Sequence, residues 1–490
     1  MFDVQLLIGE GEIQSSNSAI FERRNPVTGQ VATRAAAATI ADARAAADAA
    51  AAAFPAWSQT GPSERRAMLN RAADALEART QDFVRAMAEE TGATEGWSQF
   101  NAHLAAGMLR EAAAMTTRIT GEVIPSDKPG CLAMAIRQPA GVVLGIAPWN
   151  APIILGVRAI ALPLACGNTV VLKASELCPA TQHLIGKALR EGGLPPGVAN
   201  VVTNAPVDAA PIVETLIAHP AVRRINFTGS TKVGRVIAQL AARELKPVLL
   251  ELGGKAPLII LEDADLEEAV NAATFGAFMN QGQICMSTER IVVVQAIAEQ
   301  FAQAFGAKAS SLPAGDPRNG KVFLGSVIDA SAAERVEALI DDALTKGAVR
   351  LCGGRRQGTI MPATVLDRVT RDMRIYSEES FGPVVCIVRV RDAEEAIRVA
   401  NDSEYGLSAS VFSRDIARAL EVARRIESGM CHINGPTVHD EAQMPFGGVK
   451  HSGYGRFGGV RGIDEFTDLR WITIETRKQH YPFPAAAGAH

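Results

Sequence analysis

The sequence predicts an α/β protein with a doubly wound parallel sheet and a second α/β domain. From Gly141 onwards, short apolar runs alternate with helix-like segments, and repeated βα units of this kind predict a parallel sheet with helices on both faces. A second α/β series begins near Pro257 and continues to about Ser428. The length of 490 residues exceeds what one hydrophobic core usually supports, which favours two or three domains.

The first third of the chain is predicted to be helical. Thr39 can cap an Ala-rich helix, with Asp42 at its third position, and Ser63 can cap the next helix. The region 92–96 carries two glycines and is expected to interrupt the helical pattern. The helices are expected at residues 40–54, 64–79, 80–91 and 100–117.

The region from residue 141 to about residue 250 is predicted to alternate between strands and helices. Its apolar runs are uninterrupted, which is typical of strands buried on both faces. These strands are expected at residues 142–146, 169–173, 199–203, 224–227 and 248–250. The intervening helices are expected at residues 151–165, 180–191, 207–218 and 232–243. Because ligands bind such sheets at the carboxyl ends of the strands, the residues after each strand are candidates for function.

The composition excludes several classes of protein. Apolar residues make up 48% and charged residues 21%, a balance typical of globular chains rather than disordered ones. The 49 basic and 53 acidic residues show no Lys/Arg run, so a nucleic-acid or membrane surface is not expected. The longest charge-free apolar stretch, residues 140–157, contains Pro148 and Pro152, which suit a strand and helix better than a membrane span.

The cysteines and the N-terminus predict a cytoplasmic location. The seven cysteines lie singly and form no CxxC pair, which argues against a disulfide framework and against a metal site. The first residues lack a basic segment followed by an apolar one, so no signal peptide is expected. We therefore expect a soluble cytoplasmic protein with reduced thiols.

Two glycine-rich strings match nucleotide-binding patterns only in part. Residues 453–458 read GxGxxG, but no βαβ unit surrounds them, so a loop with tight turns is the better interpretation. Residues 229–235 lack the Lys-Ser/Thr ending of a P-loop. Thr228, Gly229 and Ser230 nevertheless connect a strand to a helix, where exposed N–H groups can bind phosphate, although a plain tight turn fits equally well.

Polar residues follow three further predicted strands. Asn150 could donate a hydrogen bond to an oxyanion, or it could cap the next helix. Lys173 and Glu176 could bind ribose hydroxyls, or they could form a solvated ion pair. Glu251 is flanked by leucines, which should raise its pKa toward the range of a general base.

Cys285 is the best candidate for a nucleophile. It lies in a small polar turn, residues 280–287, whereas the other cysteines lie mostly in apolar runs, where inert thiols are expected. Each of these signals is weak alone, but the amide, the cofactor turns, the carboxylate and the thiol are all expected at carboxyl ends of strands in one sheet.

Five strings in a fixed order resemble the aldehyde dehydrogenase superfamily. They are Pro148-Trp-Asn150, Phe227-Thr-Gly-Ser-Thr231, Glu251-Leu-Gly-Gly-Lys255, Gly282-Gln-Ile-Cys285 and Glu379-Ser-Phe-Gly-Pro383. The resemblance covers nearly the whole chain, from Asn25 to Gly453. Residues 283–290 and 434–442 are most similar to the bacterial branch that oxidises vanillin, with the salicylaldehyde and benzaldehyde enzymes close by.

The resemblance implies NAD(P)-dependent oxidation of an aromatic aldehyde to its carboxylic acid. Cys285 would attack the carbonyl as a thiolate, while Asn150 and the Cys285 N–H hold the oxyanion. The thiohemiacetal would pass hydride to the nicotinamide, and Glu251 would activate the water that hydrolyses the thioester.

The resemblance also assigns the cofactor, which is expected to be NAD with some use of NADP. The carboxylate of Glu176 would repel the 2′-phosphate of NADP, whereas Lys173 leaves that cofactor possible. Lys173 and Glu176 would hold the adenosine ribose, Gly229 and Ser230 the pyrophosphate, and Glu379 and Phe381 the nicotinamide riboside. Further cofactor-binding candidates are Ile146, Trp149, Gly234 and Leu252. The sequence departs mildly from the family pattern at Ser380 and Met286.

The helix after Asn150 is expected to line the substrate tunnel. Ala151 is small where many relatives carry an aromatic residue, which leaves room for a ring. Arg158 lies about two helical turns beyond Asn150 and can share its face, so it could meet the oxygen substituents of a phenolic aldehyde or form a salt bridge within the oligomer. Further substrate candidates are Ile154, Ile284, Met286, Val438, Asp440 and Phe446.

The family fold implies a Rossmann-type cofactor domain, an α/β catalytic domain and a small β element for oligomerisation. The expected boundaries are 1–120 with 139–252, then 253–451, and finally 121–138 with 467–480. A homodimer or homotetramer is expected, and the Ala-rich tail at 485–490 is expected to be disordered or foreign. Dehydrogenases for non-aromatic aldehydes and a cofactor-independent thiol esterase are the alternatives.

Overall fold

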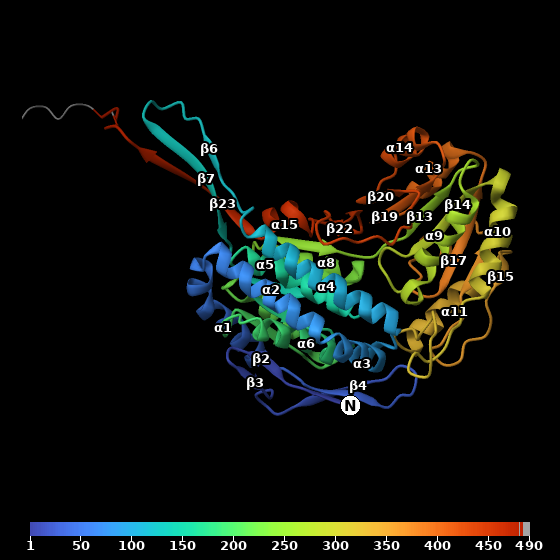
Figure 1. The fold of residues 1–490 in the computed structure, drawn as a ribbon, viewed down its shortest axis with the longest axis horizontal. Helices are drawn as coiled ribbons and strands as arrows, with labels where there is room; N and C mark the ends of the chain where they lie inside the picture. The colour runs from blue at the N-terminus through green and yellow to red at the C-terminus, as the bar shows by residue number, and fades with distance from the viewer. Residues whose placement is uncertain (480, 484–490) are drawn as a thin grey trace, which may run out of the picture.

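Two α/β lobes lie side by side in the computed structural model, and a narrow β arm projects from one of them (Figure 1). The structure describes residues 1–479 and 481–483. The tail at 485–490, which we predicted to be disordered or foreign, lies outside the described residues.

The first lobe contains an eight-stranded sheet with a parallel centre. In spatial order its strands are β22 (Gly453–Tyr454), β12 (Val248–Glu251), β11 (Val222–Thr228), β8 (Val142–Ile146), β9 (Thr169–Lys173), β10 (Ala199–Val202), β2 (Leu6–Ile8) and β3 (Gly11–Ile13). The strands from β12 to β10 run parallel, and antiparallel strands close both edges. The predicted doubly wound parallel sheet is therefore confirmed.

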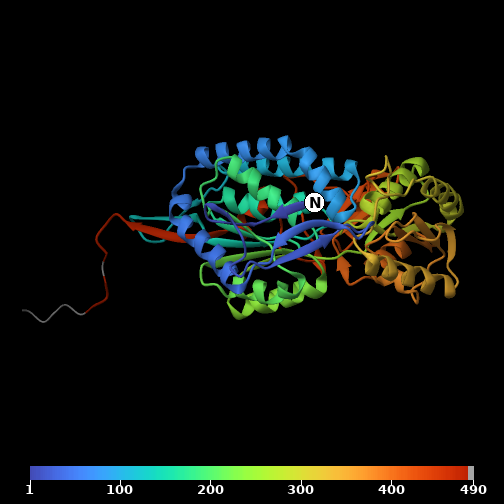
Figure 2. The ribbon, with the colours of Figure 1, turned by 90° about the horizontal axis from the view of Figure 1, so that it is seen from below.

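Helices cover both faces of this sheet. One face is covered by α1 (Ile40–Gln59), α7 (Ala209–Ala218) and α8 (Thr231–Arg243). The other is covered by α2 (Pro62–Ala78), α3 (Thr80–Thr91), α4 (Glu95–Met115), α5 (Pro152–Ala165) and α6 (Pro179–Glu191). Figure 2 shows α2 and α4 in blue on one side of the sheet, with α7 and α8 in light green on the other. Strand residues alternate between the two cores, so Val142 and Leu144 pack with α1 while Val143 packs with α5.

The second lobe repeats this architecture around a seven-stranded sheet. In spatial order its strands are β15 (Val349–Cys352), β16 (Thr364–Asp367), β17 (Val384–Val390), β14 (Thr288–Val294), β13 (Ala256–Ile260), β19 (Ser408–Phe412) and β20 (Met430–Ile433). All neighbours are parallel except β15 and β16. Its helices are α9 (Leu266–Phe278), α10 (Gln295–Ser310), α11 (Ala330–Thr345), α12 (Arg374–Ser377), α13 (Ala393–Asn401) and α14 (Ile416–Arg424).

The projecting arm is a three-stranded antiparallel sheet. It joins β6 (Glu122–Ile124), β7 (Cys131–Pro139) and β23 (Thr467–Glu475), with β23 paired along the whole of β7. Trp471 is 75% exposed on this arm, and Val123 and Leu469 are also exposed. The arm joins the segments for which we predicted an oligomerisation role, and that role stays a prediction.

The prediction of a purely helical first third is wrong at the N-terminus. Besides β2 and β3, the first 36 residues form a small sheet of β1 (Phe2–Val4), β5 (Val31–Ala36) and β4 (Ile20–Arg24). These strands are short and carry interspersed charges, so they give little periodic signal.

Two helices extend beyond their predicted ends because tertiary burial outweighs local preference. α1 continues through Pro55 to Gln59, and this extension buries Trp57 in the core. α4 begins before Phe100, with Thr94 as its N-cap, and Trp97 in its first turn is buried. The N-cap of α2 is Gly61, and Pro62 is its first helical residue, so the prediction that Ser63 caps this helix is wrong.

The GxGxxG string at residues 453–458 forms an edge strand and a set of tight turns. β22 pairs antiparallel with β12, and Gly453, Gly455 and Gly458 all have positive φ. This confirms the turn interpretation, because only glycine adopts such angles without strain. A short helix, α15 (Gly459–Glu465), follows, and β18 (Tyr405–Gly406) pairs with β21 (Val449–Lys450) nearby.

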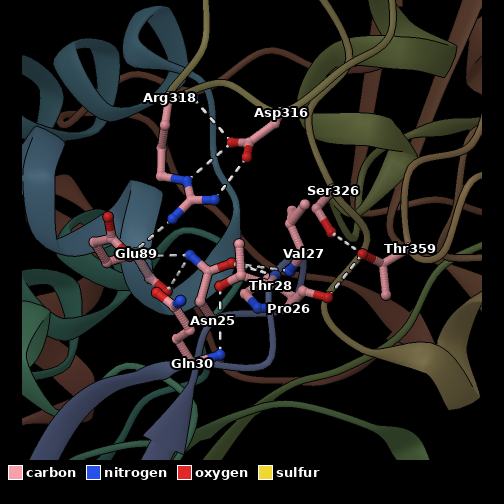
Figure 3. A network of polar contacts seen from close by, with 10 residues as sticks. All are labelled: Asn25, Pro26, Val27, Thr28, Gln30, Glu89, Asp316, Arg318, Ser326 and Thr359. Atoms are coloured by element: carbon pink, nitrogen blue, oxygen red, sulfur yellow. Dashed lines mark hydrogen bonds and ion pairs between the residues drawn. The ribbon is translucent and has the colours of Figure 1, made fainter.

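A polar network joins the N-terminal segment to the second lobe (Figure 3). The Asn25 side-chain oxygen accepts hydrogen bonds from the Val27 and Thr28 N–H groups, which forms the turn. Its amide donates to Glu89 of α3, and Glu89 also pairs with Arg318 of the second lobe. The network therefore stabilises the contact between the lobes.

Within the described residues, no helix is long and apolar enough to cross a membrane. The same part of the chain contains no group of three or more His, Cys, Asp or Glu side chains arranged to hold a metal ion.

Candidate active site

The predicted catalytic residues come together where the two sheets meet, but they do not belong to one sheet. Asn150 follows β8 and Glu251 ends β12, at the carboxyl edge of the eight-stranded sheet. Cys285 precedes β14, and Glu379 precedes β17, at the amino edge of the seven-stranded sheet. The expectation of a single sheet is therefore wrong, because the turn carrying the thiol leads into a strand instead of leaving one.

The Cys285 turn is held in an unusual backbone conformation. Asn280, Gln281 and Gly282 in succession have positive φ, which is rare for residues with a Cβ. The Gln281 side chain accepts a hydrogen bond from the Gly325 N–H at 2.9 Å and donates to the Ser326 carbonyl at 3.0 Å. Such strain persists only when the surroundings fix it, and it is typical of functional sites. Asn280, Gln281 and Gly282 were not among the functional residues predicted from the sequence.

Asn150 reaches the Cys285 turn through its side chain. Its amide Nδ2 donates to the Gln283 carbonyl at 2.9 Å, and its own carbonyl accepts from the Trp97 indole at 3.0 Å. Helix α5 begins after Ala151 without a side-chain cap, so the alternative role of Asn150 as a helix cap is wrong. One N–H of the Asn150 amide thus fixes its orientation, and the second is available to a ligand.

Glu251 is a buried carboxyl group without a hydrogen-bond partner. Its exposure is 1%, and neither carboxyl oxygen is hydrogen-bonded within the described residues. Burial raises the pKa of Glu251 to about 7, as its position after an apolar strand predicted; the nearby Arg158 guanidinium opposes this shift. Burial, followed by the neighbouring Glu251, raises the pKa of the Cys285 thiol well above its usual value. The thiol is therefore protonated at neutral pH beside a base that titrates near neutrality.

A cavity of about 250 Å³ lies on one side of Cys285 and is lined by residues predicted to bind the pyrophosphate and the nicotinamide riboside of the cofactor. Ser230 is the N-cap of α8, so the first N–H groups of this helix can bind phosphate, whereas the Gly229 N–H donates to the Glu251 carbonyl at 3.0 Å. The rings of Trp149 and Phe381 pack edge to face with their centroids 5.8 Å apart, and together they form an aromatic wall of the cavity. The predicted cofactor residues on its lining are Trp149, Gly229, Ser230, Leu252, Glu379 and Phe381.

The other predicted cofactor residues, Ile146, Lys173, Glu176 and Gly234, do not line this cavity. Lys173 and Glu176 form an ion pair after β9, and Asn204 donates to Glu176 at 3.1 Å. Ile146 ends β8 opposite Lys173. A Cβ at Gly234 would collide with Leu252, so glycine permits α8 to pack closely against the loop after β12. Glu379 accepts a hydrogen bond from the Gly254 N–H. Burial raises the pKa of Glu379 to about 7.

A second cavity, of about 360 Å³, lies on the opposite side of Cys285. It shares Asn150, Leu155 and Cys285 with the first cavity, so the thiol lies where the two meet. Its lining includes every predicted substrate residue: Ala151, Ile154, Arg158, Ile284, Met286, Val438, Asp440 and Phe446. Seven further lining residues were not predicted from the sequence: Trp97, Phe100, Leu155, Phe275, Met279, His439 and Glu441. The apolar ones lie on helices or next to one, where their spacing is indistinguishable from that of core residues.

Arg158 forms a buried ion pair with Asp440 in this second cavity. The Arg158 guanidinium carbon also lies 4.2 Å from the centre of the Phe446 ring, at cation–π distance. The partner of Arg158 in this ion pair is in the same chain. The Asp440 Oδ1 atom is buried and has no hydrogen-bond partner in the described residues, and burial raises the pKa of this carboxyl group.

A doubly wound parallel sheet whose carboxyl edge meets a half-buried thiol is the arrangement expected of a cysteine-dependent dehydrogenase. The sequence model of the aldehyde dehydrogenase family matches residues 13–472, and the chain belongs to this family. It is an NAD(P)-dependent aldehyde dehydrogenase, as its motifs predicted.

Individual relatives resemble the chain over nearly its whole length. It is 61% identical over 482 residues to vanillin dehydrogenase of Pseudomonas sp. (strain HR199 / DSM 7063), covering 98% of this chain and 100% of that protein. It is 52% identical over 480 residues to salicylaldehyde dehydrogenase of Pseudomonas putida, with 98% and 99% covered. The crystal structure of a salicylaldehyde dehydrogenase from Pseudomonas putida G7 complexed with salicylaldehyde superposes with a TM-score of 0.97 at 52% identity, covering 99% of this chain and 100% of that one.

Proposed function

We propose that this enzyme oxidises a hydroxylated aromatic aldehyde, vanillin first among them, to the carboxylic acid. The observation that carries this proposal is the 360 Å³ cavity at Cys285, which combines apolar and aromatic walls with one buried ion pair. An apolar cavity with few polar groups suits a ring that bears one or two oxygen substituents. The 61% identity to a vanillin dehydrogenase supports the same substrate.

In the proposed reaction, Cys285 is the nucleophile and Glu251 the base. The Cys285 thiol loses its proton to solvent, and the Sγ thiolate adds to the aldehyde carbon to give a thiohemiacetal. The second N–H of the Asn150 amide and the Cys285 N–H hold the oxyanion. When bound, the nicotinamide cofactor would supply the acceptor for the hydride that leaves the thiohemiacetal carbon, and a thioester on Cys285 would remain. Glu251 then deprotonates a water molecule that hydrolyses the thioester and releases the acid.

We propose NAD as the preferred cofactor because of Glu176. Replacing Glu176 by alanine removes a carboxylate that would repel a 2′-phosphate, so the kcat/KM ratio of NADP to NAD is expected to rise about tenfold. Steady-state kinetics with both cofactors measures this ratio. Glu214→Ala, an exposed glutamate on α7, is the control and should leave the ratio unchanged. An unchanged ratio in Glu176→Ala would remove Glu176 from cofactor selection.

The Arg158–Asp440 pair is proposed to select hydroxylated rings, with the free Asp440 Oδ1 accepting the phenolic hydroxyl. Arg158→Leu alone would leave a buried uncompensated carboxylate, so the informative variant is the neutral double change Arg158→Met with Asp440→Asn. Since hydrogen bonds to charged groups contribute about 1.5–3 kcal/mol, the preference for vanillin over benzaldehyde should fall about 10- to 100-fold. Benzaldehyde turnover by the same variant is the internal control, and an unchanged preference contradicts the proposed role.

The formation of reduced nicotinamide, followed by absorbance, tests the proposed function directly. The substrates are vanillin, salicylaldehyde, benzaldehyde, a straight-chain aldehyde and betaine aldehyde, each with NAD. A preference for vanillin is expected, whereas a preference for the last two would discard the aromatic substrate class. Esterase activity without cofactor and without aldehyde oxidation would favour the thiol-hydrolase alternative.

We further propose that the enzyme is a homodimer or homotetramer and that the β arm takes part in its assembly. The exposed Trp471, Val123 and Leu469 side chains support this proposal, since apolar side chains gathered on a narrow surface favour a partner. The cytoplasmic location stays a prediction from the cysteine pattern.

A further inference from the structure

A buried polar cluster lies directly behind the active site. Lys255, Glu289 and Ser380 form it; the Lys255 side chain is fully buried, the Glu289 side chain is 4% exposed, and Ser380 is also buried. Lys255 Nζ donates to Glu289 Oε2 at 2.7 Å and to Ser380 Oγ at 3.3 Å. The proposed chemistry gives none of these groups a role, and buried charges are costly to retain without one.

Each member of the cluster follows closely after a proposed active-site residue. Lys255 lies in the loop after Glu251, Glu289 lies at the start of β14 after Cys285, and Ser380 comes directly after Glu379. The cluster therefore links the three chain segments that carry the base, the nucleophile and the cofactor-binding carboxylate.

Glu289 makes most of its contacts with the turn at residues 379–381. Its carboxylate accepts the Ser380 N–H at 3.0 Å, the Phe381 N–H at 3.1 Å and the Ser380 hydroxyl at 2.7 Å. Phe381 has φ of +46°, a conformation that a bulky residue adopts only when neighbouring groups hold it. Ser380, where the sequence departs from the family pattern, is thus the residue whose hydroxyl reaches this carboxylate.

The turn at residues 379–381 forms one wall of the cofactor cavity. The side chain of Phe381 meets Trp149 edge to face, and the Glu379 carboxylate accepts the Gly254 N–H at 2.9 Å from the same loop that carries Lys255. Arg335 of α11, which lines the same cavity, donates to the Ser380 carbonyl at 2.5 Å. A turn fixed by several hydrogen bonds presents its side chains to the cavity in one orientation, which lowers the entropy lost on binding.

We propose that Lys255, Glu289 and Ser380 are positioning residues that hold the Glu379–Phe381 turn in the conformation that binds the nicotinamide riboside of the cofactor. This inference rests on the proposed role of Glu379 and Phe381 in cofactor binding. The cluster acts through the turn and touches neither the cofactor nor the aldehyde. Its loss is expected to weaken cofactor binding more than it changes the reactivity of the thiol.

The experiment measures the Kd of NAD by titration calorimetry, together with KM and kcat, in Ser380→Ala and Glu289→Gln. Ser380→Ala removes one hydroxyl and keeps the buried ion pair, so it should fold and raise the Kd of NAD about threefold. Glu289→Gln leaves Lys255 without its charged partner, and we expect the Kd to rise at least tenfold, with KM for NAD rising in parallel and the KM for the aldehyde unchanged. Ser380→Thr, which keeps the hydroxyl, should restore binding.

Asp367→Asn is the matched control, because Asp367 forms a similarly buried ion pair with Arg389 at the carboxyl ends of β16 and β17, away from the site. It should lower the melting temperature without changing the Kd. Wild-type Kd values in folded Ser380→Ala and Glu289→Gln would overturn the inference, as would an equal rise in Asp367→Asn. If the proposed cofactor site itself were wrong, Phe381→Ala would also leave the Kd unchanged, which separates the two failures.

Discussion

Cys285→Ala is expected to abolish aldehyde oxidation while leaving cofactor binding intact. The thiol lies where the two cavities meet, and no other described cysteine lines either of them. Loss of a covalent nucleophile typically lowers kcat by on the order of 10⁴-fold or more. Reduced-nicotinamide absorbance measures the turnover, and calorimetry with NAD shows whether the cofactor still binds.

The control for this variant is Cys131→Ala, on the β arm far from both cavities, which should keep full activity. Mass spectrometry after alkylation adds a second readout, since an aldehyde analogue that reacts with thiols should label wild type and Cys131→Ala but not Cys285→Ala. Residual activity within tenfold of wild type in Cys285→Ala would contradict the nucleophilic role. Loss of NAD binding in the same variant would point to a folding defect instead.

The sequence was sufficient to predict the fold class, the family and the central strands. Strands such as Val142–Ile146 are continuous apolar runs, which are typical of strands buried on both faces of a parallel sheet. The raised pKa of Glu251 followed from the same logic, because a carboxyl group at the end of a buried strand loses its hydration.

Features that depend on contacts between distant segments could not be predicted. Trp97 lines the substrate cavity only because α4 packs beside α5, and its sequence spacing marks it as a core residue. Likewise, the Cys285 turn faces the carboxyl edge of a different sheet, a relation that no local pattern encodes. The ion pair between Arg158 and Asp440 joins residues 282 positions apart, and the sequence could not reveal it.

Glu251→Gln is expected to separate the two halves of the reaction. Without a carboxylate to deprotonate water, the thioester should accumulate, so one equivalent of reduced cofactor should form in a rapid burst. Steady turnover should then fall on the order of 10²- to 10⁴-fold. Stopped-flow absorbance measures the burst, and mass spectrometry of the quenched enzyme detects the acyl group on Cys285. Glu244→Gln, an exposed glutamate after α8, is the control and should show neither effect.

The pH dependence of turnover and of stability, compared between wild type and Glu251→Gln, is a second test of the role of Glu251. Because the folded pKa of Glu251 is about 7, the steady turnover of wild type should rise with pH through about 7 and then level off, and the slow turnover of Glu251→Gln should lack this step. The stability of the folded wild type should instead fall as pH rises. The folded pKa lies above the ordinary value of 4.5, so ionisation costs the folded state, and wild type should lose stability relative to Glu251→Gln as pH rises from about 4.5 to about 7. The difference between their melting temperatures at pH 5 and pH 8 measures this cost, and a pH-independent difference would mean that Glu251 titrates at its ordinary pKa and is ionised throughout the working range.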